Sequence, residues 1–194
     1  VVIVGVDEPM VKQWIDNYEI VATNPDEVTD ARTLAAKIGM LKAVNDYDLK
    51  RVISFHNGIP RAKKFSEEIV EVANFIEPAS RPEGTFLVDY VSGKMRAGDR
   101  KDKIDRLKVL EGYDRGILTN ARCLAEGVDV PMLDGVAFID PKGSQVDIIQ
   151  AVGRAIRKVR GATVQTKGTI VIPVFIEDGD DHEKSIEASN FKPV

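Results

Sequence analysis

Short apolar segments that alternate with helical patterns constrain the fold of this chain more than any other feature. Each segment is apolar along most of its length, and a strand of this kind is typical of a sheet covered on both faces. Apolar strands separated by helices predict a mostly parallel sheet with helices on either side. The sequence therefore predicts an α/β fold, with strands over residues 1–6, 51–55, 86–90, 116–119, 135–139 and 169–176.

Helices are predicted between these strands from apolar residues at helical spacing. The first runs from residue 26 to about residue 46, and residues 24–26 provide its start signal. The second begins near Pro60, which the first turn of a helix tolerates, and the third covers about residues 99–110. Pro173 interrupts the last strand, which predicts a bulge or an edge position there.

The segment from Gln150 to Arg157 has two different faces when it is drawn as a helix. At about 100° per residue, Gln150, Arg154 and Arg157 share one face, and apolar residues occupy the opposite one. Guanidinium groups match phosphate oxygens in charge and in bidentate geometry. The segment predicts either a phosphate-facing site or the solvated basic face of an amphipathic helix.

Composition and charge limit the kinds of partner. The chain has 194 residues, of which 43% are hydrophobic, and this predicts one sizeable core. The net charge of −4 argues against nucleic-acid binding by bulk charge, so such binding requires a local patch. Residues 94–108 provide one, with seven basic and three acidic residues. Acidic residues gather after residue 176, where a solvated extension is expected.

Cys123 is the only cysteine, so the chain cannot form an intrachain disulfide. A cysteine-based metal site is not expected, and we predict no metal ligands. A reducing, cytoplasmic setting fits this composition. The first six residues are apolar but too few to span a bilayer, so no membrane association is expected. Because the chain begins within a predicted strand and without methionine, we expect it to be a piece of a longer protein.

Turn residues and glycines follow four of the predicted strands. In a parallel sheet the ligand-binding loops lie at the carboxyl ends of the strands, so the loops after Phe55, Tyr90, Thr119 and Ile139 should line one edge. Taken singly, Asn57-Gly58 and Ser92-Gly93 are ordinary turn dipeptides, Gly127 can relieve a tight backbone and Asp129 can cap a loop. Their joint order on successive strand ends indicates a binding edge.

These motifs, in this order, resemble the second RecA-like domain of superfamily 2 helicases and translocases. The resemblance covers about residues 51–176 and depends most on residues 124–131 and on the Gln-x-x-Gly-Arg-x-x-Arg motif at residues 150–157. Both motifs are similar to those of the motor subunits of type I and type III restriction enzymes and of the excision-repair helicase. The resemblance implies a RecA-like three-layer α/β/α domain.

The resemblance also implies roles for single residues. Arg154 and Arg157 match the arginines that reach the γ-phosphate of ATP, and Gln150 matches a position that couples the nucleotide to the neighbouring domain. Gly127, Asp129 and Gly153 match positions that border the nucleotide. Positions that contact the nucleic-acid phosphate backbone are matched by Asn57, Gly58, Arg61, Gly93, Lys94 and Thr119. Such contacts are largely insensitive to base sequence. DNA is the expected partner, and RNA is not excluded.

The sequence lacks the Gly-x-x-x-x-Gly-Lys-Ser/Thr phosphate loop and its Asp-Glu companion. ATP and Mg²⁺ should therefore be bound mainly by a first RecA-like domain of the same polypeptide, and this chain alone should not hydrolyse ATP. We expect residues 1–50 to be a strand and a long helix that link the two motor domains and pack on this one. Residues 51–176 are expected to form the C-terminal motor domain, and residues 177–194 an acidic extension.

Two other interpretations remain open from the sequence. A non-catalytic nucleic-acid-binding or regulatory module with a helicase-like shape would use the basic residues 94–108, and the acidic extension could gate them. A doubly wound enzyme acting on a small nucleotide or sugar is less compatible, because no glycine-rich fingerprint follows the first strand.

Overall fold

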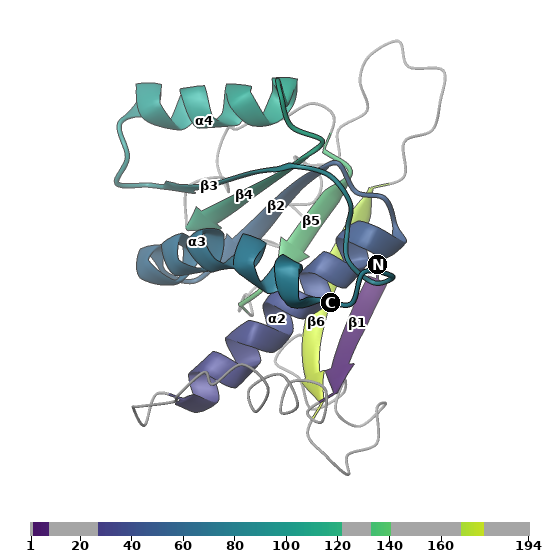
Figure 1. Ribbon diagram of the computed structural model, residues 1–194. Coiled ribbons are helices and arrows are strands. Elements are labelled where there is room, and N and C mark those ends of the chain that lie inside the picture. The colour runs from purple at the N-terminus through teal and green to yellow at the C-terminus, as the bar shows by residue number, and fades with distance from the viewer. Residues whose placement is uncertain (1, 8–26, 122–132, 141–167, 177–194) are drawn as a thin grey trace.

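The computed structural model describes residues 2–7, 27–121, 133–140 and 168–176. Strands and helices alternate along these residues, as the sequence predicts (Figure 1). The elements are β1 (Val2–Asp7), α2 (Glu27–Asp46), β2 (Arg51–His56), α3 (Ile59–Phe75), β3 (Phe86–Ser92), α4 (Ala97–Val109), β4 (Arg115–Ala121), β5 (Gly135–Phe138) and β6 (Thr169–Ile176).

The described strands form one sheet in the order β1-β6-β5-β2-β4-β3. Every described pair of neighbouring strands is parallel. The predicted parallel sheet is therefore confirmed. Because all strands run in the same direction, their carboxyl ends meet at one edge, as the arrowheads in Figure 1 show.

Helices cover both faces of the sheet. The helices α2 and α3 contact each other on one face, where α2 packs on β1 and β6 and α3 packs on β2, β3 and β4. The helix α4 lies on the opposite face over β3 and β4 (Figure 1). Successive strand residues enter opposite cores: Ile117 joins the core under α2 and α3, and Leu118 joins the core under α4. The predicted three-layer α/β/α arrangement is confirmed.

The helix α2 is buried on almost every side from Leu34 to Val44, whereas the sequence predicts one buried stripe. Small residues allow this burial, because a Cβ atom built at Gly39 would lie only 3.0 Å from the Pro173 side chain. Even Lys37 is buried, and its ammonium group lies 2.5 Å from a Glu68 carboxylate oxygen on α3.

The strand β1 pairs with β6 in the same sheet, while the expected domain boundary at residue 50 stays a prediction.

Pro173 lies in an inner strand and not at an edge or a bulge, which corrects the prediction from the sequence. The strand β6 has β1 on one side and β5 on the other, and Pro173 is in register with Val4 of β1. On the other side, the pairing with β5 ends at Val171. Pro173 lies two residues beyond the last pair with β5. The N–H group that proline lacks therefore leaves no described group of β5 without its hydrogen-bond partner.

Several strands are longer than the sequence indicates, because buried polar residues continue the pairing. The sequence predicts His56 in a turn, but this residue closes β2 in register with Ala121 of β4. Its Nε2 atom lies 3.0 Å from the Ser54 hydroxyl oxygen, and its ring lies against Phe65.

The helix α4 begins at Ala97, two residues before its predicted start. Of the described helices, none is long and apolar enough to cross a membrane.

The Lys37–Glu68 ion pair generates a stability prediction. Glu68→Gln leaves the buried Lys37 ammonium without its counter-charge, so we expect the free energy of unfolding to fall by about 2 kcal/mol in urea denaturation. Glu67→Gln is the matched control, because Glu67 forms an exposed pair with Lys63 at 3.6 Å and should change stability by less than about 0.5 kcal/mol. Equal effects of the two substitutions would contradict a stabilising role for the buried pair.

The buried imidazole of His56 generates a pH prediction. Burial lowers the pKa of His56 from 6.5 to about 3, and the nearby Arg61 charge adds to this shift. Between these two values the unfolded chain binds more protons than the folded protein, so stability falls as the pH is lowered below 6.5. His56→Gln should remove up to about 1 kcal/mol per pH unit from this dependence.

The measurement is the free energy of unfolding by denaturant at several pH values between about 7 and 4, where a buried neutral histidine makes its contribution. His182, the second histidine of the chain, lies outside the described residues and supplies the control substitution His182→Gln. Parallel pH curves for the wild-type protein and His56→Gln would show that the His56 imidazole is not the titrating group.

Candidate nucleic-acid interface

The carboxyl edge of the sheet brings together the segments that the sequence predicts as one rim. In the strand register, Ala121 of β4 is level with both His56 of β2 and Ser92 of β3. Phe138 of β5 is level with Phe55 of β2, and the two rings stack with centroids 5.3 Å apart. The segments that follow β2, β3 and β5 therefore leave the sheet at one edge, with those after β5 and β2 on neighbouring strands and β4 between β2 and β3.

Asn57, Gly58 and Arg61 lie together where β2 passes into α3. Gly58 is the N-terminal cap residue of α3 and Pro60 stands in its first turn, as the sequence indicates. Asn57 is exposed and Gly58 is partly exposed. The side chain of Arg61 is 51% exposed, and its Nη2 atom lies 3.0 Å from an Asp140 carboxylate oxygen. This segment presents one cation and exposed backbone at the edge.

Asp140 has a structural role that the sequence analysis does not assign, although the residue directly follows a predicted strand. Its side chain is 4% exposed. One carboxylate oxygen accepts a hydrogen bond from the Asn57 backbone N–H at 2.9 Å, and the other pairs with Arg61. A buried acid directly after an apolar strand is the signal available in the sequence, since a buried carboxylate requires partners.

Thr119 lies within β4 as predicted, but the strand continues two residues beyond the expected end, to Ala121. The side chain of Thr119 is fully buried, and its hydroxyl donates a hydrogen bond to the Ala62 carbonyl oxygen in the first turn of α3 at 2.7 Å. Thr119 therefore ties α3 to β4. Its contact with a nucleic acid stays a prediction, and the buried hydroxyl is already used.

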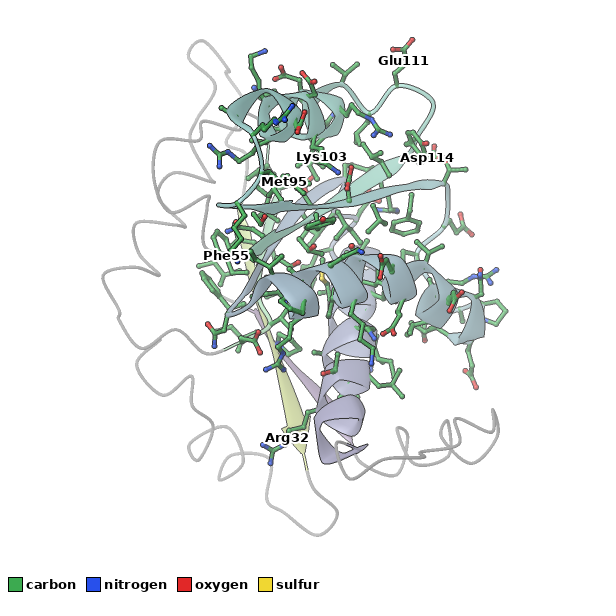
Figure 2. All side chains as sticks on the ribbon, turned by 90° about the vertical axis from the view of Figure 1, so that its left-hand side faces the viewer. Arg32, Phe55, Met95, Lys103, Glu111 and Asp114 are labelled. Atoms are coloured by element: carbon green, nitrogen blue, oxygen red, sulfur yellow. The ribbon has the colours of Figure 1, made fainter. Side chains whose placement is uncertain are left out.

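Gly93 and Lys94 form the turn that follows β3, and both are exposed. The Met95 N–H donates to the Ser92 carbonyl oxygen at 3.1 Å, which closes this turn before α4. Figure 2 shows Met95 beside the sheet and below α4. Arg96, which precedes α4, is also exposed. This turn adds two exposed cations to the edge.

The basic residues from 94 to 108 are partly neutralised by acidic neighbours. Lys103 and Arg106 pair with Asp89 of β3, and Lys103 lies between α4 and the sheet (Figure 2). Lys101 and Lys108 both pair with Asp105, and their hydrogen bonds lower the pKa of that carboxyl. Within the described part of the chain, the cations of this group without an ion pair are Lys94, Arg96 and Arg100. The patch is therefore concentrated near the carboxyl end of β3.

The residues expected to bind ATP lie outside the described residues: Gly127, Asp129, Gln150, Gly153, Arg154 and Arg157. Asp140 is the last described residue before the segment that carries the last four of them. Among the described residues, no group of His, Cys, Asp or Glu side chains is arranged to hold a metal ion.

Comparison with known proteins indicates the family of the chain. The sequence profile described as helicase conserved C-terminal domain matches residues 36–159. No curated protein sequence gives a significant match.

Two solved structures are similar over nearly the whole chain. The first is the ATP-dependent Type ISP restriction-modification enzyme LlaBIII bound to DNA, with 27% identity, a TM-score of 0.68 and coverage of 98% of this chain and 13% of that one. The second is the C-terminal part of the Fun30 ATPase domain, which has 17% identity and a TM-score of 0.55 and shares the fold, with coverage of 92% of this chain and 52% of that one. The chain thus spans a minor part of the restriction enzyme and about half of the Fun30 structure.

The profile match covers more than half of the sequence, and the parallel sheet with helices on both faces agrees with it. The chain belongs to the helicase conserved C-terminal domain family, as a second RecA-like domain of the superfamily 2 type.

Proposed function

We propose that this chain is the C-terminal motor domain of an ATP-dependent DNA helicase or translocase. The observation that carries the proposal is that two exposed segments with basic side chains leave the same edge of the sheet, one on each side of β4. These are Asn57–Arg61 after β2 and Gly93–Arg96 after β3. The segment with the predicted ATP-facing arginines follows β5, which ends at the same edge.

The two basic segments suit a phosphate backbone. Arg61, Lys94 and Arg96 are exposed cations, and a guanidinium or ammonium group binds phosphate oxygens by charge and hydrogen bonding. Contacts of this type position a protein on a nucleic acid without reading its sequence. A local cluster also explains how a chain of net charge −4 can bind a polyanion. The likeness to an enzyme bound to DNA favours DNA over RNA.

The ATP side of the proposal depends on residues outside the described part of the chain. Arg154 and Arg157 would contact the γ-phosphate, and Gln150 would couple that contact to the partner domain. Gly127, Asp129 and Gly153 would border the nucleotide. Arginines of this kind stabilise the charge that develops on a transferring phosphoryl group. A first RecA-like domain would supply the phosphate and Mg²⁺ site, so this chain alone would not hydrolyse ATP.

Closure and release of the two domains would move the bound strand. The carboxyl edge of this domain would hold phosphates while the other domain shifts, and the reverse would follow. A cytoplasmic location belongs to the same proposal. The non-catalytic module is not favoured, because four of the seven basic residues at 94–108 are engaged in ion pairs within the domain.

Arg157→Ala tests the ATP side in the polypeptide that joins this chain to its first motor domain. We expect DNA-stimulated ATP hydrolysis to fall by at least about 100-fold, because an arginine that faces the γ-phosphate acts mainly on the transition state. Binding of ATP should change little. Arg81→Ala is the matched control, because Arg81 precedes β3 at the opposite edge of the sheet. Near-normal turnover by the Arg157→Ala protein would disprove the assignment.

Lys94→Ala tests the nucleic-acid side in the same polypeptide. Duplex DNA should bind about fivefold more weakly, and the slope of log Kd against log salt should fall by about one, because one phosphate contact is lost. Lys50→Ala removes the same charge at the amino edge, where Lys50 pairs with Asp48 at 2.9 Å, and should leave the slope unchanged. Equal changes in both variants would indicate a general charge effect and contradict the site.

A further inference from the structure

The buried carboxylate of Asp140 joins the end of β5 to the beginning of α3. It accepts the Asn57 backbone N–H at 2.9 Å through one oxygen and pairs with the Arg61 guanidinium at 3.0 Å through the other. Both partners belong to the segment that we assign to the nucleic-acid backbone. Asp140 itself is only 4% exposed, so it is not placed to contact a large ligand directly.

Arg61 keeps most of its binding capacity in this arrangement. A guanidinium group has five N–H donors, and the described structure uses one nitrogen of Arg61, Nη2, for Asp140. The side chain remains 51% exposed. The first turn of α3 is also anchored to β4, since the Thr119 hydroxyl donates a hydrogen bond to the Ala62 carbonyl oxygen at 2.7 Å. The Arg61 guanidinium therefore extends from an anchored helix turn, and it keeps N–H donors available to a ligand.

An arginine that is already held loses less conformational freedom when it binds a phosphate. The same carboxylate also places a negative charge beside the site, and this charge repels phosphate. These two effects have opposite signs. Removal of the carboxylate weakens nucleic-acid binding if orientation dominates, and strengthens it if charge dominates.

We propose that Asp140 is a positioning residue that orients the Arg61 guanidinium for a phosphate of the bound nucleic acid, and that its hydrogen bond from the Asn57 N–H fixes the start of the same segment. The inference rests on the proposed function, in which this edge binds the backbone. We expect orientation to dominate, because a single buried carboxylate holds two groups of one short segment at once.

The test is Asp140→Asn in the polypeptide that contains both motor domains, with a labelled DNA duplex and the same single strand as probes. We expect DNA binding to weaken by about 10-fold, although the substitution removes a negative charge from the protein. Asp140→Asn should have little further effect in an Arg61→Ala background, because the two residues act as one unit.

The matched control is Asp134→Asn. Asp134 is the acid that precedes β5 at the opposite edge, where it accepts the backbone N–H groups of Lys50 and Arg51 at 2.8 Å each. Each substitution removes one carboxylate that lies next to an end of β5 and accepts hydrogen bonds from backbone N–H groups. A comparable loss of stability is expected in the two variants, measured by urea denaturation, but Asp134→Asn should leave DNA affinity unchanged.

Arg61→Lys provides a second variant that does not depend on how Asp140→Asn folds, because Arg61 is half exposed. Lysine keeps the charge but lacks the planar fork, so DNA should bind about fivefold more weakly. Unchanged binding by Arg61→Lys would overturn the inference, as would tighter or unchanged binding by Asp140→Asn or an equal loss in the Arg61→Ala background. A wild-type protein that binds neither probe would instead overturn the proposed function itself.

Discussion

Burial of the central strands on both faces is the constraint on which the rest of the structure depends. Neighbouring residues of β4, Ile117 and Leu118, enter opposite cores, and the same alternation holds at Val52 and Ile53 of β2. No face of β2, β4 or β5 is therefore free to carry polar chemistry, since an unpaired polar group in either core would be costly. Polar residues that remain inside, such as Thr119, are hydrogen-bonded. Around these strands, exposed polar and basic groups such as Asn57 and Arg61 therefore lie beyond the strand ends.

A carboxylate that accepts backbone N–H groups occurs at both ends of β5, and the two carboxylates differ in their further contacts. Asp134 before the strand and Asp140 after it each hold backbone N–H groups of the segments that flank β2. Burial raises the pKa of the Asp134 carboxyl, against the lowering effect of its backbone hydrogen bonds. The contacts of Asp134 serve the fold. Asp140 adds an ion pair to a half-exposed arginine, and under the proposed function this pair makes a structural anchor part of the nucleic-acid-binding edge.

Much of the fold follows from local pattern, and the errors have physical causes. The strands, the parallel sheet and the three layers are predictable because apolar runs and helical spacing report burial directly. The pattern misses the all-round burial of α2 because a second helix, α3, packs against it. Proline lacks an N–H group and so indicates an edge at Pro173, but pairing with β5 ends before this residue. The pattern also ends two strands too early, at Phe55 and Thr119, because the buried polar residues that follow, His56 and Asn120, resemble turn residues when their partners are unknown.

The sequence by itself determined the α/β class and the family, and it predicted that the candidate binding loops share one edge, because all strands of a parallel sheet end at the same side. It also identified Arg61 and Lys94 as candidate cations. Tertiary structure alone decided which cations are free to act. The ion pair between α4 and β3 engages Lys103, whose side chain is 24% exposed, while Lys94 stays exposed and has no described ion pair. It also decided the role of Asp140, because the contact with Asn57 joins residues 83 positions apart. Such pairings depend on distances between elements that are remote in the chain, and no local pattern encodes them.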